Sequence, residues 1–181
     1  MMANGDIYDG EWSANMPHGK GEMKYKDGRE YSGDWLEGKH NGKGTFKWAN
    51  GNVYVGGFSN NMPHGKGELK YENGSEYSGE WLKGKLHGKG TFKWANGDVY
   101  DGGWSVDQLH GEGNMKYRNG SEYSGEWVDG KRHGKGTFKW ANGDFYDGGW
   151  SADQLHGKGN LKYRNGSEYS GEWVDGKPLA F

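Results

Sequence analysis

One tyrosine position recurs every 23 residues along the chain. Its eight copies are Tyr8, Tyr31, Tyr54, Tyr77, Tyr100, Tyr123, Tyr146 and Tyr169, and no insertion or deletion interrupts the spacing. A glycine stands two positions after each tyrosine, and a tryptophan, or once Phe58, stands four positions after it. A fixed period of this length is typical of repeat proteins, in which each structural unit packs mainly against its neighbours.

A second period of 46 residues lies over the first. Residues 73–118 and 119–164 are identical at 39 of 46 positions, so slightly different repeats come in pairs. Duplication of a two-repeat block explains this similarity, and so does deliberate construction. The sequence is compatible with both origins.

Each period predicts one β-hairpin. Side-chain character alternates along residues 77–81 and again along 89–94, as in strands with one buried face. Asn96-Gly97 follows the second segment, and Asn-Gly pairs favour tight hairpin turns in which both residues adopt positive φ. The other connection passes through Gly84, where the remaining repeats carry Gly, Asn or Asp, the residues that most readily adopt the left-handed conformation.

The alternation also assigns the two faces of the predicted sheet. Tyr77, Gly79 and Trp81 share one face, and we expect Phe92 and Trp94 on the same face, with rings lying across bare glycine backbone. The opposite face carries Lys, Glu, Ser and Thr. The predicted fold class is therefore all-β: an elongated single-layer antiparallel sheet of stacked β-hairpins.

The composition agrees with a core of rings rather than aliphatic side chains. Of 181 residues, 37 are Gly, ten Trp and twelve Tyr, whereas Ile, Val, Leu and Phe together number 21. So few aliphatic residues exclude an ordinary aliphatic core, and so many rings with a net charge of −2 exclude a disordered chain. The absence of cysteine excludes disulfides and thiolate metal sites. The small net charge gives no general attraction to nucleic acid.

The repeat motif resembles a known family. Tyr-x-Gly-x-Trp is followed by x-x-Gly-x-x-His-Gly-x-Gly, which resembles the MORN repeat (membrane occupation and recognition nexus) from about Ala3 to Lys177. The sequence departs from the motif at Phe58, at Asn41 and in the final half-repeat. The resemblance implies a single MORN array over residues 1–181, with about seven and a half repeats starting near the eight tyrosines. Because the chain begins and ends within a repeat, we expect a fragment of a longer protein.

The family resemblance also carries expectations about function. In the better understood members the array is a platform for protein binding or dimerisation, and a lipid-binding role is attributed to others. For this chain the resemblance implies a non-catalytic interaction scaffold that binds a partner peptide, or its own copy, along an aromatic groove or a sheet edge. Two alternatives stay open: a peripheral membrane module that binds phosphoinositides, and a regulatory module fused to an enzyme outside this chain.

No side chain is singled out for catalysis. Every carboxylate, Ser and His belongs to a repeated column, and equivalent groups of neighbouring repeats lie about 10 Å apart, too far to act on one bond. The repeated histidines, such as His87 and His133, have the same spacing, whereas zinc ligands lie within about 2.1 Å of a common centre. We expect these histidines to cap or pack the turn beside their glycine, and we expect no enzymatic activity, metal or cofactor.

Two sets of side chains are candidate binding surfaces. An uncovered aromatic face is an expected site for a protein partner, and its candidate residues are Trp48, Tyr71, Trp94, Tyr117 and Trp140. The alternative is that these rings belong to the core. A strip of lysines is the candidate surface for phosphoinositide headgroups, and consists of Lys43, Lys66, Lys89, Lys93, Lys135 and Lys139. The alternative is a solvated face that Glu80 and Glu126 neutralise across the strands.

The expected partner is therefore a protein segment or a second copy of the chain in a dimer, with membrane phosphoinositides as the alternative and no nucleic acid. The chain has no apolar run of the length needed to span a membrane and no signal-peptide pattern. We expect a cytoplasmic protein, with association to the cytoskeleton or to a membrane left open.

Overall fold

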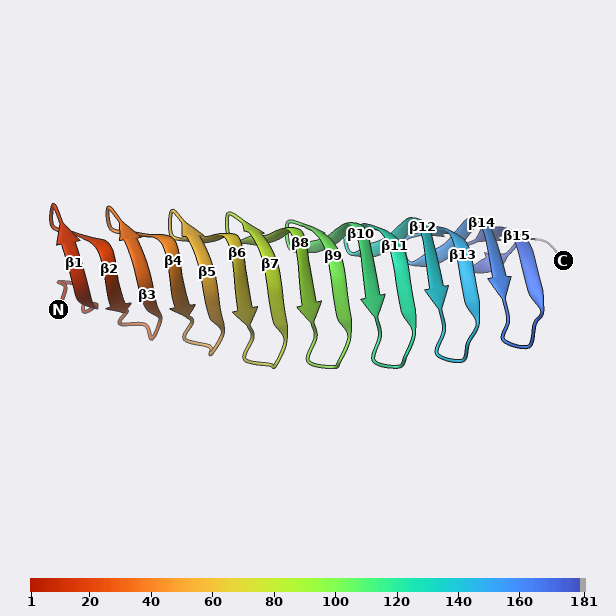
Figure 1. Ribbon diagram of the computed structural model, residues 1–181, viewed down its shortest axis with the longest axis horizontal. Coiled ribbons are helices and arrows are strands. Elements are labelled where there is room, and N and C mark those ends of the chain that lie inside the picture. The colour runs from red at the N-terminus through yellow and green to blue at the C-terminus, as the bar shows by residue number, and fades with distance from the viewer. Residues whose placement is uncertain (180–181) are drawn as a thin grey trace. The chain divides into compact units, whose positions relative to one another are not determined.

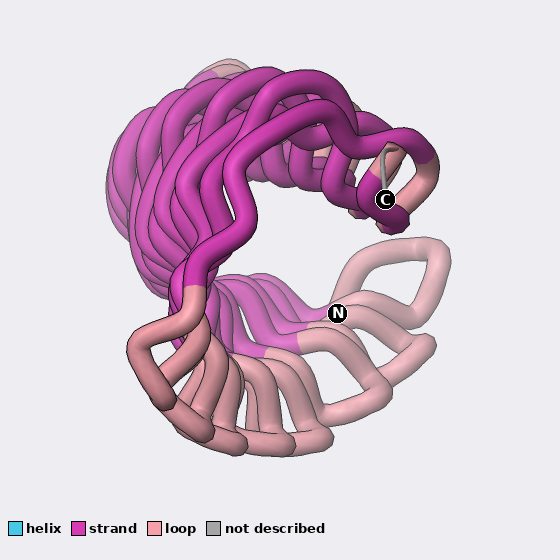
Figure 2. The backbone as a smooth tube through the Cα atoms, turned by 90° about the vertical axis from the view of Figure 1, so that its right-hand side faces the viewer, coloured by secondary structure: helices cyan, strands magenta, loops and turns pink. Residues whose placement is uncertain are grey.

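The computed structural model describes residues 1–179, which form antiparallel strands joined by short turns. The strands within this range are β1 (Ile7–Ser13), β2 (Met16–Lys24), β3 (Glu30–Leu36), β4 (Lys39–Lys47), β5 (Val53–Ser59), β6 (Met62–Lys70), β7 (Glu76–Leu82), β8 (Lys85–Lys93), β9 (Val99–Ser105), β10 (Gln108–Lys116), β11 (Glu122–Val128), β12 (Lys131–Lys139), β13 (Phe145–Ser151), β14 (Gln154–Lys162), β15 (Glu168–Val174) and β16 (Lys177–Pro178). Strands that follow one another in the chain are neighbours in the sheet (Figure 1). The long strands curve along their length (Figure 2). The predicted fold class, a single-layer antiparallel sheet of β-hairpins, is confirmed.

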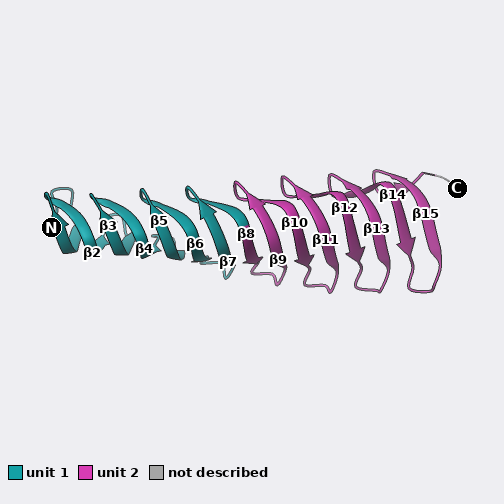
Figure 3. Ribbon diagram, turned by 45° about the horizontal axis from the view of Figure 1, so that its top comes forward, with its two compact units in different colours: residues 1–88 teal, residues 89–181 magenta. Residues whose placement is uncertain are grey.

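The chain divides into two compact units, residues 1–88 and residues 89–181 (Figure 3). The first unit contains β1 to β7 and the beginning of β8, and the second contains the rest of β8 and the strands that follow it. Within each unit the hairpins share one construction. Among the described residues, no helix is long and apolar enough to cross a membrane.

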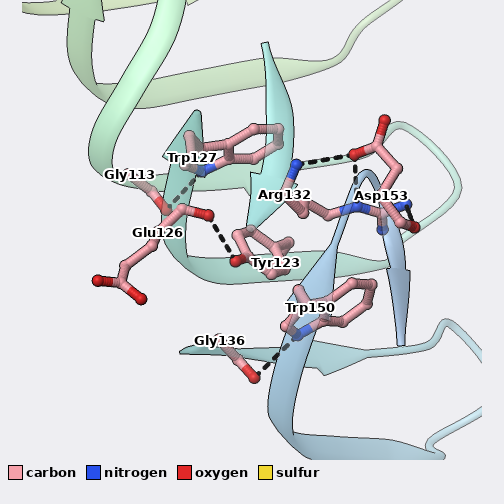
Figure 4. Close-up of polar contacts among 8 residues, drawn as sticks. All are labelled: Gly113, Tyr123, Glu126, Trp127, Arg132, Gly136, Trp150 and Asp153. Atoms are coloured by element: carbon pink, nitrogen blue, oxygen red, sulfur yellow. Dashed lines mark hydrogen bonds and ion pairs between the residues drawn. The ribbon is translucent and has the colours of Figure 1, made fainter. Parts of the chain in front are cut away.

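A ladder of aromatic rings forms the core of each unit. The side chains of six repeat tyrosines are fully buried, namely Tyr31, Tyr54, Tyr77, Tyr100, Tyr123 and Tyr146. The Tyr123 ring lies edge-to-face between two indoles, with its centroid 5.0 Å from that of Trp127 and 5.2 Å from that of Trp150 (Figure 4). Its hydroxyl donates a 2.8 Å hydrogen bond to the Glu126 carbonyl oxygen, and the Trp127 indole N–H donates to the Gly113 carbonyl oxygen at 3.2 Å. Every polar atom of these two rings is therefore paired inside the core.

Paired glycines let the strands bend around each tyrosine. Gly125 of β11 lies opposite Gly136 of β12. A Cβ atom at Gly125 would stand 2.5 Å from the Gly136 Cα, and one at Gly136 would stand 2.5 Å from Cζ of Tyr123. The ring thus lies directly on bare backbone, as the alternation predicts. Because a sheet of one layer has no second layer to cover its rings, this close approach is what buries the tyrosine.

The two-residue connection within each repeat is a type I′ turn. In the β11–β12 hairpin, Val128 pairs with Lys131, and the two residues between them both have positive φ, 49° at Asp129 and 81° at Gly130. Type I′ turns match the twist of the flanking strands and require positive φ at both central positions. The preference for Gly, Asn or Asp at the second position, read from the Gly84 column, therefore has the predicted cause.

The Asn-Gly connection has a different geometry from the one predicted. Gly143 has a φ of 99°, whereas Asn142 is not among the residues with positive φ. The Gly143 N–H donates to the Trp140 carbonyl oxygen at 3.0 Å, and Asn142 Oδ1 accepts a 2.9 Å hydrogen bond from the Asp144 N–H. This is a three-residue connection, a turn closed by a left-handed glycine. The prediction that both Asn and Gly have positive φ is therefore wrong. The asparagine contributes instead through its side-chain oxygen, which accepts a hydrogen bond within the turn.

From β3 onward, alternating hairpins stabilise their bulges in different ways, which is one of the differences that give the 46-residue period. In the β11–β12 hairpin, residues 133–135 bulge opposite Glu126, and the Glu126 carboxylate accepts a 2.6 Å hydrogen bond from the Lys135 N–H. One repeat later Gly149 replaces this glutamate, and a Cβ atom there would collide with the His156 carbonyl oxygen. A carboxylate is used in one kind of hairpin, and the other kind requires glycine at the same position.

Val106 is a strained residue of the second unit. It occupies the first central position of a type I′ turn with a φ of 45° and is 63% exposed, whereas Asn60 occupies the same position in another repeat. A β-branched residue is disfavoured at positive φ. We expect Val106→Asn to stabilise the protein by about 1 kcal/mol, measured as a higher midpoint of thermal unfolding. The control is Val128→Asn on strand β11, which should give no stabilisation because asparagine is depleted in strands. An unchanged or lower midpoint for Val106→Asn would contradict this account.

Candidate protein-binding groove

The five aromatic residues predicted to bind a partner share one structural position. Each lies directly after a strand, at the start of an Asn-Gly turn, and each is half-buried. The turn fixes the backbone, since the Trp48 N–H donates to the Asn52 carbonyl oxygen at 2.9 Å and the Trp140 N–H to that of Asp144 at 2.9 Å. Each of these rings therefore contributes to packing and also presents a surface to solvent.

Phenylalanine rings of the core support three of these aromatic residues. Centroid distances are 4.7 Å between Trp48 and Phe46, 4.5 Å between Trp94 and Phe92, and 4.7 Å between Trp140 and Phe138. Ring pairs at these separations attract one another and restrict the orientation of the exposed ring.

A pocket of about 420 Å³ lies against Trp48 in the first unit. Its lining consists of Tyr25, Arg29, Gly38, His40, Phe46, Trp48, Phe58, Asn61 and Pro63. Tyr25, Arg29 and Trp48 flank the Asp27-Gly28 and Asn50-Gly51 turns at one end of the strands. The remaining lining residues come from β4, β5, the start of β6 and the two-residue turns at the other end. The curved hairpins thus bring two distant columns of the sequence to one opening.

His40 is the buried polar group of this pocket. Its side chain stacks on the Tyr31 ring, with a centroid distance of 3.8 Å, and its Nε2 lies 2.7 Å from the Tyr25 hydroxyl. The His40 N–H donates to Asn61 Oδ1 at 2.8 Å. Burial, with a smaller contribution from the charge of Arg29, lowers the pKa of His40 to about 4. The imidazole is therefore neutral at physiological pH, and its buried Nδ1 has no hydrogen-bond partner.

A pocket of about 340 Å³ lies against Trp140 in the second unit. Its lining consists of Arg132, Phe138, Trp140, Trp150, Asp153, Gln154, Leu155 and Gly176. The Arg132 Nε donates to Asp153 Oδ1 at 3.2 Å, and its Nη2 donates to the Asp153 carbonyl oxygen at 3.0 Å (Figure 4). The guanidinium carbon also lies 4.7 Å from the Trp150 ring centroid, which places the cation over the indole face.

His40 and Arg132 are two pocket residues that were not among the binding residues predicted from the sequence. They stand in one column of the repeat, nine positions after the tyrosine, and the full column is Pro17, His40, Pro63, Leu86, Leu109, Arg132, Leu155 and Pro178. The sequence signal that could have identified them is that they are the two polar residues in a column otherwise made of proline and leucine. In both repeats the backbone N–H of this residue donates to a side chain 21 positions later, Asn61 for His40 and Asp153 for Arg132, and the Arg132 side chain adds its own bond to Asp153.

The six lysines predicted for lipid headgroups are all exposed. The register places Lys66 opposite Glu80 and Lys139 opposite Glu122, so unlike charges stand in register at these two pairs, while the Glu80 carboxylate lies beside Gly88 of its own bulge. Glu126 lies opposite Glu112 instead, and its carboxylate bonds the Lys135 amide rather than a lysine ammonium. The expected neutralisation by Glu126 is therefore corrected, because the bulge draws its carboxylate to the backbone.

Two of the repeated histidines contact the turn of the following hairpin. His18 Nδ1 accepts a hydrogen bond from the Glu37 N–H at 3.3 Å, and His64 Nδ1 accepts one from the Lys83 N–H at 3.4 Å. These two histidines do contact a turn, but it belongs to the following hairpin and is not the turn expected beside their own glycine. Over residues 1–179, no group of three or more His, Asp or Glu side chains could hold a metal ion.

Comparison with known proteins places these features in a family. A search of curated protein sequences gave no match. Similar solved structures include the Drosophila melanogaster SAS-4 (dCPAP) TCP domain in complex with a proline rich motif of Ana2, at 15% identity and a TM-score of 0.49, covering 84% of this chain and 83% of that one. They also include the Danio rerio CPAP TCP10 domain in complex with a STIL peptide, at 12% identity and a TM-score of 0.26, covering 93% of this chain and 99% of that one. A profile of the MORN repeat matches residues 8–28, 31–53, 54–76, 77–99, 100–122, 123–145, 146–168 and 169–178. With seven full repeats and a partial eighth, the chain belongs to the MORN repeat family.

Proposed function

We propose that this protein is a non-catalytic interaction scaffold whose aromatic groove binds an extended segment of a partner protein. The groove is defined here within each unit: Trp48 and Tyr71 with the pocket beside Trp48 in the first, and Trp94, Tyr117 and Trp140 with the pocket beside Trp140 in the second. The observation that carries the proposal is the state of these rings. They are packed on one edge by core residues and open to solvent on another, next to a pocket in each unit.

Physical reasoning favours this surface over the opposite face. Tryptophan and tyrosine contribute most where a rigid ring is held at the side of an apolar pocket, which is where interface hot spots are found. The opposite face carries side chains of both charge signs, such as Lys66 and Glu80 in register, and charged groups in water contribute little to affinity.

The test replaces two rings of the second unit together. Peptides that bind the full chain are first selected from a random displayed library, and their affinities are then measured by fluorescence anisotropy. We expect Trp94→Ala combined with Trp140→Ala to weaken binding by roughly thirtyfold or more, since truncating one hot-spot tryptophan costs about 2 kcal/mol. Far-ultraviolet circular dichroism should remain that of the unchanged protein, because both rings are half-exposed.

The matched control is Phe145→Ala, which removes an exposed ring from the opposite face of the sheet and should leave binding unchanged. Sedimentation velocity of the same variants separates partner binding from self-association through the groove. Unchanged peptide affinity and unchanged self-association in the folded double variant would refute the proposal.

A further inference from the structure

The two pockets are the same site in different repeats. His40, Phe46, Trp48 and Pro63 of the first pocket correspond to Arg132, Phe138, Trp140 and Leu155 of the second, at a constant offset of 92 residues, which is four periods of 23. The two pockets therefore occupy equivalent positions of the repeat, four hairpins apart, and the aromatic position beside them recurs in every hairpin between. A ligand that fits one hairpin can continue to the next one within the same unit, provided that its own repeat has the same length.

The charges of both pockets are already paired. Arg29 Nε lies 2.7 Å from Asp27 Oδ2, and its guanidinium lies over the Tyr25 ring. Arg132 is paired with Asp153 in the second pocket. A charged side chain entering either pocket would lose its hydration without finding an unpaired partner of opposite charge. Charge complementarity therefore selects an uncharged, apolar segment for the groove.

The spacing of the hairpins selects the conformation of that segment. Neighbouring strands of a sheet lie about 4.7–4.9 Å apart, and each repeat contributes two strands. Equivalent rings of successive repeats are therefore about 9.5 Å apart along the groove. A polyproline II helix has three residues per turn and rises about 3.1 Å per residue, so every third side chain recurs after about 9.3 Å. An extended β-strand repeats its side-chain direction after about 6.6 Å and an α-helix after about 5.4 Å, so neither keeps register with successive rings.

Proline meets the chemical requirement as well as the spacing. Its ring is apolar and uncharged, and aromatic-lined grooves bind polyproline II segments because this conformation is already ordered before binding. Its backbone carbonyls face outward and need donors, and the exposed Gln154 side chain at the second pocket supplies an amide N–H. We infer that the groove binds a proline-rich segment in the polyproline II conformation, with a proline at every third position. This inference rests on the proposed function.

The test compares two synthetic peptides of identical length and composition on the full chain. One carries proline at every third position, and the other carries the same prolines at every fourth position, with alanine and glutamine elsewhere. Fluorescence anisotropy should show at least about tenfold tighter binding of the first peptide, the equivalent of one well-packed contact. Trp140→Ala should weaken this binding, whereas Phe145→Ala should not. Lengthening the first peptide by one further triplet should tighten it again.

The outcomes separate this inference from the proposed function. Equal affinities of the two peptides would overturn the polyproline register. So would a result in which neither peptide binds but proline-free library peptides do, with an affinity that depends on Trp94 and Trp140. In both cases the groove would remain a peptide-binding site. Tighter binding of the first peptide that persists in both Trp140→Ala and Trp48→Ala would overturn the assignment to these pockets. Library peptides that are all insensitive to the groove variants would overturn the proposed function itself.

Discussion

Gly136→Ala is expected to destabilise the second unit by about 3 kcal/mol or more. The added Cβ would meet the Tyr123 hydroxyl oxygen and would stand 2.5 Å from its Cζ and 2.6 Å from its Cε2. The tyrosine cannot move aside. Its side chain is fully buried, it lies between Trp127 and Trp150, and its hydroxyl is bonded to the Glu126 carbonyl. The ring or the backbone of β12 must therefore leave its position.

The measurement is urea unfolding followed by circular dichroism, together with amide hydrogen exchange of strands β11 and β12. Hydrogen exchange is needed because repeat proteins can open in sections, so that a single global free energy is not always defined. We expect the loss of protection to be concentrated at these two strands.

The control is Gly166→Ala, at a turn glycine with a φ of 93° and no atom within 4 Å of the added Cβ. It measures the cost of a positive φ without a collision, expected to be about 1 kcal/mol. Gly136 is not among the glycines with positive φ, so its substitution tests the collision alone. Similar losses in the two variants would show that ring contact is not what requires glycine in the strand.

The hairpins could be predicted from the sequence because the strands, faces and turns of each repeat are determined by residues close together in the chain. Tyr123, Gly125 and Trp127 alternate with polar residues, and their spacing fixes which side chains share a face. The burial of the tyrosine and the position of its ring over glycine followed from this pattern. The turn at Asp129 and Gly130 followed from the residues that tolerate positive φ.

The pockets could not be predicted because they depend on how far the hairpins curve. Trp48 and His40 lie at opposite ends of strand β4, and only the bend at the paired glycines makes them line one opening. Alternation along a strand specifies faces but not curvature. For the same reason, the role of Glu126 was misassigned: the bulge that turns its carboxylate toward the backbone is not visible in a pattern of period two.

The repeat position of His40 and Arg132 is apolar in the other repeats, and the two polar side chains are accommodated there in different ways. Arg132 keeps its charge and is matched by the carboxylate of Asp153 and by the faces of aromatic rings. His40 instead gives up its charge, and its neutral imidazole is paired through Nε2 with the Tyr25 hydroxyl.

Acidification is expected to destabilise the first unit through His40. The folded-state pKa of His40 is about 4, whereas an unfolded histidine titrates near 6.5, so the unfolded state binds the proton more readily. The contribution of His40 is therefore fully present above about pH 6.5 and is lost as the pH falls toward 4. A difference of this size corresponds to at most about 3 kcal/mol, and partial hydration of the pocket reduces it. The groups that face the imidazole are Tyr25, Tyr31, Trp35, Phe46 and Phe58, with the Arg29 charge nearby.

The matched variant is His40→Leu, because leucine occupies this column in three other repeats. Urea unfolding of the wild type and of this variant should diverge between neutral pH and about pH 4.5, with the variant losing less stability on acidification. His64→Leu, which removes an exposed histidine of the next repeat, is the control for losing a histidine outside the pocket. Carboxylate titration is common to all three proteins and cancels in the comparison. Parallel pH profiles for the wild type and His40→Leu, or a His40 ring resonance that titrates near pH 6.5 in the folded protein, would show that the imidazole is not held neutral by burial.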